Sequence, residues 1–97
     1  MPPVSKMGDV VIHPGYTPTM IMNGSPNVLI NNIPATTVGS MISIHFRLAW
    51  PFPPCPPNPI VLGSSTVLVN GKPLARMGDK SGCGGIIMQG SPNVIAG

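Results

Sequence analysis

The amino-acid sequence predicts an all-β domain in which three β-hairpin units with long connecting loops surround a pseudo-threefold axis. Three observations carry this prediction. The composition favours strands and turns, one strand-and-turn pattern occurs three times, and the third copy finds its return arm at the N-terminus. The 97 residues suit a single domain, which we place over 1–97.

The composition excludes several other classes. Proline (14) and glycine (12) exceed a quarter of the chain, charged residues are only 7%, and there is no glutamate. Because 42% of the residues are hydrophobic, the chain must bury apolar surface while turning often, which favours short strands over helices. The five positively charged residues form no continuous run, so the sequence does not indicate nucleic-acid binding. We find no signal peptide and no membrane span, and expect synthesis in the cytoplasm.

The repeat has the pattern Gly-Ser-x-x-Val followed by two hydrophobic residues, and its copies begin at Gly24, Gly63 and Gly90. In the first two copies the strand turns at Asn31-Asn32 or at Asn70-Gly71. Asn-Gly is the strongest two-residue hairpin signal, because both positions of a type I′ turn need a positive φ. Each of these copies therefore predicts a β-hairpin.

The third copy reaches the end of the sequence before it can form a return arm of its own. The N-terminus supplies one, since residues 3–9 match residues 73–79 with a constant offset of 70. We therefore predict that the chain closes on itself with adjacent termini. The three units are 90–97 plus 1–23, 24–62, and 63–89.

The repeat places both histidines and one cysteine at equivalent positions. Each return arm ends in a hydrophobic residue and a glycine, and His13, His45 and Cys83 follow that glycine by five, six and five residues. Around a shared axis these side chains would converge. Cys55 lies in the proline-rich connection 46–59, whose stiff backbone can hold a thiolate over the axis. Two imidazoles and two thiolates form a tetrahedral set suited to one Zn²⁺, with iron as the alternative.

Two alternatives to a metal site stay open at this point. Cys55 and Cys83 could form a disulfide, or the histidines could lie at the surface beside buried free thiols. A structural ion would suit a chain with a small core, because metal binding contributes to folding. Asp9 and Asp79 occupy equivalent positions, where they either stabilise turns or accept an imidazole N–H.

The repeated strands are apolar on both faces. Leu29, Leu68 and Ile95 point one way, and the valines before them point the other way. One face can fill the interior while the other docks a partner, although burial of both faces within the chain remains an alternative. A surface of this kind favours a partner with threefold symmetry. The residues that we assign to docking are Val28, Ile30, Val67, Val69 and Val94.

Taken together, these motifs resemble the PAAR-repeat proteins over essentially the whole chain. The likeness is carried by the repeated pattern, by the late Cys83-Gly84-Gly85, and by Pro73-Leu74-Ala75-Arg76-Met77-Gly78-Asp79. The Pro-Ala-Ala-Arg motif of the family appears here as Pro73-Leu74-Ala75-Arg76 and, more degenerate, as Pro34-Ala35-Thr36-Thr37.

The resemblance implies a cone-shaped monomer with a metal near its apex. One such monomer would cap the trimeric β-helical spike of a type VI secretion system or of the baseplate of a contractile phage tail. Family members commonly use three histidines and one cysteine, so His13, His45 and Cys83 match while Cys55 stands where a third histidine is expected.

The implied role is a structural piercing tip and not an enzyme. It would contact the target envelope transiently, without stable membrane insertion, and would bind no nucleic acid. The short length of the chain favours assembly on a phage virion over assembly on a secretion spike. A small metal-dependent hydrolase and a zinc module for nucleic acid are the alternative functions.

Overall fold

In the computed structural model, which describes residues 2–97, all regular secondary structure is β, and the predicted fold class is confirmed. The described residues contain no helix that could cross a membrane. The strands are β1 (Val10–Ile12), β2 (Thr19–Met20), β3 (Leu29–Ile30), β4 (Ile33–Pro34), β5 (Met41–Ile42), β6 (His45–Phe46), β7 (Pro54–Cys55), β8 (Asn58–Pro59), β9 (Leu68–Val69), β10 (Lys72–Pro73) and β11 (Ile86–Ile87).

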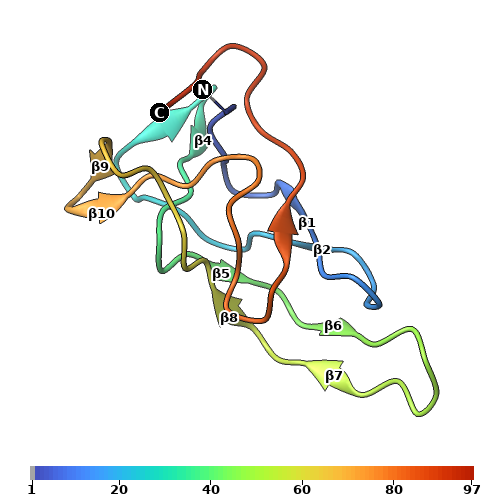
Figure 1. Ribbon diagram of the computed structural model, residues 1–97. Helices are drawn as coiled ribbons and strands as arrows, with labels where there is room; N and C mark the ends of the chain where they lie inside the picture. Colours follow the sequence, from blue (N-terminus) through green and yellow to red (C-terminus); the bar gives the residue numbers. More distant parts are fainter. Residues whose placement is uncertain (1) are drawn as a thin grey trace.

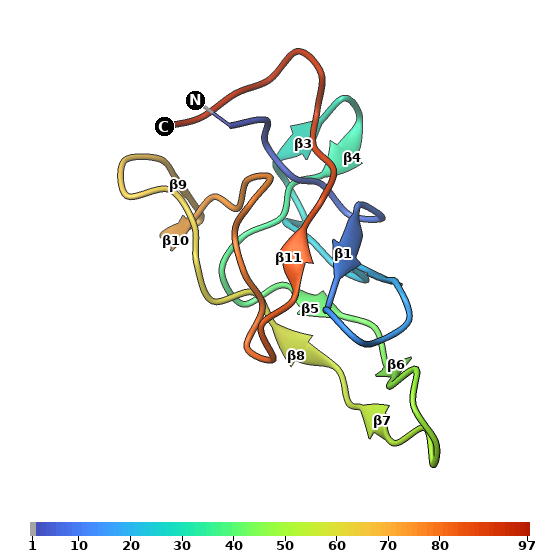
Figure 2. The same ribbon diagram turned by 45° about the vertical axis from the view of Figure 1, so that its right-hand side comes forward.

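The molecule is elongated, with extents of 40 × 23 × 22 Å. One end carries both termini and the pairs β3–β4 and β9–β10, and we call it the base (Figures 1 and 2). The opposite, narrower end is formed by β6, β7 and the loop between them, and we call residues 45–55 the tip hairpin. Strands β1, β5, β8 and β11 lie between the two ends.

The base is built from the predicted hairpins. Strand β3 pairs with β4 and β9 pairs with β10, each as an antiparallel two-residue ladder. The turn residues Asn31 and Asn32 have φ angles of 52° and 67°, and Asn70 and Gly71 have 53° and 79°. These are the positive values that a type I′ turn requires.

The third copy of the repeat pairs with the N-terminal segment, as predicted. Pro3 forms an antiparallel bridge with Ile95, and the Val4 N–H donates to the Val94 carbonyl at 2.9 Å. The N-terminal segment, described from Pro2, consequently lies beside the C-terminal segment in both views (Figures 1 and 2), and the Ala96 N–H donates to the Pro2 carbonyl at 3.2 Å. The limits that we drew between the three units stay a prediction.

The return arms meet in a closed ring at the centre of the base. The bridges between them are Val4 with Arg76, Lys6 with Ala35, and Thr37 with Leu74. Between these bridges lie Ser5, Thr36 and Ala75, which are fully buried and which we call the central ring. The Ser5 N–H donates to Ala75 at 3.0 Å, Thr36 to Ser5 at 3.1 Å, and Ala75 to Thr36 at 2.8 Å. Each return arm thus donates one backbone hydrogen bond to one neighbouring arm and accepts one from the other, which is the arrangement that a pseudo-threefold axis produces.

The apolar core is split into two clusters. The base cluster consists of Val4, Ile30, Ala35, Val69, Leu74 and Ala96. The second cluster consists of Val11, Ile21, Ile42, Ile60, Ala75 and Ile87. Both clusters contain equivalent residues from the three units. In the second cluster, the carbonyls of Ile21, Ile60 and Ile87 accept the N–H groups of Gly8, Gly39 and Gly78 at 2.8–2.9 Å.

The base cluster corrects part of the docking assignment. Ile30 and Val69 are buried in it, so the prediction that these two lie on an accessible face is wrong. This face of the strands from the two hairpins meets in one buried cluster. Val28 and Val94 are half-buried against the same cluster, and Val67 is 36% exposed.

Candidate metal centre

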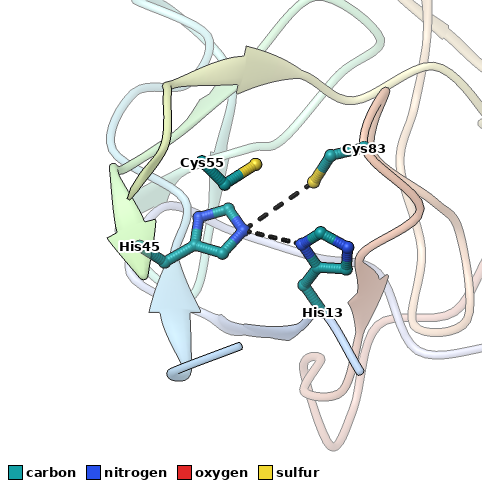
Figure 3. A group of neighbouring side chains, drawn as sticks. All are labelled: His13, His45, Cys55 and Cys83. Atoms are coloured by element: carbon teal, nitrogen blue, oxygen red, sulfur yellow. Dashed lines mark hydrogen bonds between the residues drawn. The ribbon is translucent and has the colours of Figure 1, made fainter. Parts of the chain in front are cut away.

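The four side chains selected from the sequence come together in the structure. His13, His45, Cys55 and Cys83 place their ligand atoms within 4.8 Å of one another, a grouping that could hold a metal ion (Figure 3). One nitrogen of the His45 ring faces both His13 and Cys83 (Figure 3). The residues reach this point from three separate segments of the chain, and His13, His45 and Cys83 lie at equivalent positions of the repeat.

The tip hairpin supplies two of the four residues. His45 in β6 is the direct cross-strand partner of Cys55 in β7, so the two side chains project on the same side of the ladder. The Arg47 N–H donates to the Pro53 carbonyl at 3.0 Å and continues the pairing into the loop. The connection predicted as a stiff strap is therefore a hairpin. Its prolines fit because they lack only the donor and still offer carbonyl acceptors to the opposite strand.

Two loops supply the other residues. His13 follows β1 directly, and Cys83 lies in the loop before β11, which pairs with β1. That loop is closed by Ser81, whose N–H donates to the Gly85 carbonyl at 2.8 Å and whose hydroxyl accepts the Gly85 N–H at 3.0 Å. A side chain at Gly85 would come within 2.8 Å of the Ser81 hydroxyl, so the close turn requires glycine.

The ligand atoms lie near the separations of a tetrahedral ion, with one pair slightly closer and the whole group within 4.8 Å. His13 Nδ1 lies 3.1 Å and Cys83 Sγ 3.8 Å from His45 Nε2. Bonds of about 2.0–2.3 Å to zinc would hold neighbouring ligand atoms about 3.3–3.8 Å apart. His45 Nδ1 lies 3.1 Å from the Ser43 carbonyl. We assign the ring proton to that contact, which leaves the lone pair of Nε2 directed into the group.

The two thiols differ in acidity. Burial raises the pKa of Cys83, but hydrogen bonds from the Ser81 hydroxyl, the Gly85 N–H and the Cys55 thiol outweigh it and lower the pKa to about 7. Burial, followed by the neighbouring Cys83, raises the pKa of Cys55 to about 11. Both thiols are free in the structure. One thiolate is thus available near neutral pH, and Cys55 loses its proton when a cation binds.

Tyr16 covers the histidine rings, a role that no pattern in the sequence indicates. Its ring stacks on His13 with centroids 3.9 Å apart and an angle of 6°, and meets His45 edge-on at 5.5 Å. The Tyr16 N–H donates to the His13 carbonyl at 2.9 Å, so the turn between the two residues fixes the stack. Burial, and then the nearby His45, lowers the pKa of His13, which favours the neutral imidazole that binds metals.

The only two acids in the chain belong to turns. An Asp9 carboxylate oxygen accepts the Lys6 N–H at 2.9 Å, and one from Asp79 accepts the Arg76 N–H at 2.8 Å. Each aspartate also forms an ion pair with the same residue, at 2.8 and 3.1 Å. Neither acid belongs to the His and Cys group found in residues 2–97. The group therefore offers no carboxylate base for the hydrolase alternative.

Comparison with known proteins gives a family and several relatives. Residues 8–89 match the PAAR motif family. Over 91 residues the chain is 37% identical to the NAD(P)(+) glycohydrolase toxin Tse6 and to the (p)ppApp synthetase toxin Tas1, both of Pseudomonas aeruginosa. These matches cover 87% of this chain and 20% of each toxin. The double-stranded DNA deaminase toxin A of Burkholderia cenocepacia is 38% identical over 77 residues, which are 73% of this chain and 5% of that toxin.

Proposed function

The chain belongs to the PAAR-motif family, and from that membership we propose that it is a structural tip that caps a trimeric β-helical spike, one chain per trimer. The observation that carries the proposal is the closed ring of three return arms in the base. A single chain that repeats one backbone contact three times offers nearly the same surface to each chain of a trimer.

The base offers apolar side chains in the same symmetric pattern. Leu29, Leu68 and Ile95 occupy equivalent positions in the repeat and are 54%, 62% and 55% exposed. Apolar residues exposed to this degree at three equivalent places favour contact with a partner. We propose them as the principal docking residues, with Val28, Val67 and Val94 beside them. Ile30 and Val69 support the docking surface from within the base cluster.

The metal centre would lock the narrow end. We propose that His13, His45, Cys55 and Cys83 hold one Zn²⁺, with iron as the alternative metal. Such an ion supplies a structural cross-link, because it ties the tip hairpin to the loops that follow β1 and precede β11. Four protein ligands complete a structural zinc set, in contrast to catalytic sites, which keep a position open.

The relatives favour the type VI secretion spike over the contractile phage tail as the setting of this chain. The chain spans about a fifth of the length of the first two toxins, so their named activities belong to much longer proteins. A domain that occurs within bacterial toxins fits a delivery device. We therefore propose that this chain is made in the cytoplasm and assembles, without catalytic activity of its own, on a type VI secretion spike.

Native mass spectrometry tests the capping. The metal-loaded chain, mixed with a purified trimeric β-helical spike protein of a type VI secretion system, should form a complex of one cap and three spike chains. Leu68→Ser at the base should weaken it, whereas Leu48→Ser at the opposite end should not. These residues are 62% and 64% exposed, so the pair matches residue type and exposure. A spike that stays uncapped would refute the proposal.

Elemental analysis tests the metal. We expect one zinc per purified chain, and loss of the ion in Cys55→Ser, the ligand with no counterpart in the repeat. Unchanged metal content in that variant would remove Cys55 from the ligand set. Iron in place of zinc would leave the set intact and change only the ion.

A further inference from the structure

The tip hairpin ends in an exposed apolar patch that neither the metal centre nor the docking surface uses. Leu48, Trp50 and Phe52 are 64%, 84% and 54% exposed, and we call these three residues the tip patch. They lie in the loop between β6 and β7, at the end of the molecule farthest from the termini (Figures 1 and 2). Within residues 41–63 the only charged side chain is Arg47, a cation beside the patch.

The backbone of this loop has few free donors. Residues 47–54 include three prolines, at 51, 53 and 54, which have no N–H. Of the five remaining N–H groups, three donate to backbone carbonyls at 2.7–3.0 Å: those of Arg47, Leu48 and Phe52. An unpaired N–H is costly in hydrocarbon, where water cannot satisfy it. The loop can therefore leave water at a smaller cost than an ordinary turn of the same length.

These observations identify the partner chemistry. Tryptophan with other large apolar residues is typical of the membrane–water interface, and a neighbouring arginine suits anionic headgroups. A stable protein interface takes about 20–30 residues a side, and the whole tip hairpin has eleven residues. We propose that the tip patch inserts into the interfacial region of a lipid bilayer, with Arg47 at the level of the headgroups.

This inference deepens the proposed spike-tip function and takes its biological setting from it. The proposed lipid binding does not depend on capping, because the isolated chain should bind vesicles in the absence of any spike. The contact is shallow and reversible, since a single loop enters the bilayer. The patch would thus give the narrow end an affinity for the surface that it meets first.

Vesicle titration of the full, metal-loaded chain tests the proposal. Trp50 is the only tryptophan, so its fluorescence reports on the tip alone. With phosphatidylcholine vesicles we expect a blue shift and shielding from an aqueous quencher. Adding phosphatidylglycerol should strengthen binding, and Arg47→Gln should remove that gain. Binding that ignores lipid charge in the native chain would overturn the role of Arg47.

Leu48→Ser and Leu68→Ser form the matched pair. Loss of one inserted leucine should weaken vesicle binding about tenfold in Leu48→Ser, and Leu68→Ser should stay within about twofold because its side chain lies at the base. Co-sedimentation of Phe52→Ser provides a second tip variant, with metal content as the check on folding. Equal losses from tip and base variants would show general apolar adhesion and overturn the proposal.

Two other results would also overturn it. One is an unshifted Trp50 spectrum with both vesicle types. The other is a dimer, formed without vesicles and abolished by Leu48→Ser, because a second copy would then cover the patch. The capping experiment separates the two proposals. A chain that forms the 1:3 spike complex but ignores vesicles would refute the lipid contact alone.

Discussion

The base and the tip of this molecule are held together by different interactions. In the base, three return arms exchange backbone hydrogen bonds of 2.8–3.1 Å around Ser5, Thr36 and Ala75. At the tip, a two-residue ladder and two loops meet through four side chains whose ligand atoms lie within 4.8 Å. Backbone bonds form with any side chain that fits, whereas the tip group would gain stability from a bound cation.

The insertion explains why the two ends differ. Residues 46–59 occur in one of the three units only, so the pseudo-threefold pattern cannot continue to the narrow end. Among residues 2–97, the second core cluster is the last buried apolar cluster on the way to the narrow end. The proposed metal cross-link would substitute for the repeated backbone contacts of the base.

The largest effect should come from removing the central ligand. His45→Ala deletes the ring that contacts both His13 and Cys83, so the metal should be lost and the free energy of unfolding should fall by at least about 3 kcal/mol. Chemical unfolding with elemental analysis measures both. Hydrogen exchange should show residues 45–55 and 81–85 losing protection before the central ring. Simultaneous loss in both regions would mean that the ends are not separable.

A smaller effect is expected at the base from adding one methyl group. A Cβ at Gly24, Gly63 or Gly90 would lie 2.6–2.9 Å from the Cβ of the facing proline. Gly→Ala at each position should therefore destabilise the chain by about 1–3 kcal/mol, by overpacking. Similar values at all three would follow from the pseudo-threefold symmetry.

Gly82→Ala is the control for this series, because its nearest neighbours lie at 3.7 Å or more. It should change the free energy of unfolding by less than about 0.5 kcal/mol. If Gly82→Ala costs as much as the base variants, the close contacts with the prolines are not the cause.

The tip should also respond to pH when metal is absent. Folding lowers the pKa of Cys83 from its ordinary 9.0 to about 7, since hydrogen bonds outweigh burial, so its contribution is complete above pH 9 and is lost as pH falls through 7. Burial, with Cys83 nearby, raises the pKa of Cys55 to about 11, so that contribution is complete below pH 9 and is lost as pH rises towards 11.

The metal-free chain should therefore be most stable near pH 9, where the two contributions meet. Urea unfolding with a chelator, across pH 6–11, checks this. Cys83→Ser should flatten the rise between pH 7 and 9, and a rise that survives in this variant would assign it to another group.

The smallest effect concerns the ring that covers the centre. Tyr16→Ala removes the stack on His13, and stacks of this kind contribute about 0.5–1.5 kcal/mol, so metal transfer to a chelator should speed up roughly twofold to tenfold. Tyr16→Phe keeps the stack and should behave like the native chain. Equal rates in Tyr16→Ala and the native chain would show that the stack does not retain the ion.

Much of the candidate site could be read from the sequence because the repeat fixes equivalence. His13, His45 and Cys83 follow the same return arm in three units, and equivalent positions around an axis must approach one another. Cys55 has no equivalent in the repeat, so its part in the site was predicted from the stiffness of the proline-rich connection. The contact between Tyr16 and the site could not be predicted, because a single aromatic residue in a turn gives no pattern that would link it to His13.

The sequence by itself determined the all-β fold, the pairing of the N-terminal segment with the third copy of the repeat, and the equivalence of three candidate metal ligands, because local turn chemistry and a repeated pattern are sufficient for these. The tertiary structure alone decided which apolar face is buried. Alternation separates Ile30 and Val69 from Leu29 and Leu68, but when both faces are apolar only the curvature around the axis selects the inner one. It also decided that His45 pairs with Cys55, and that Leu48, Trp50 and Phe52 face solvent, since these depend on how the insertion folds back as a hairpin.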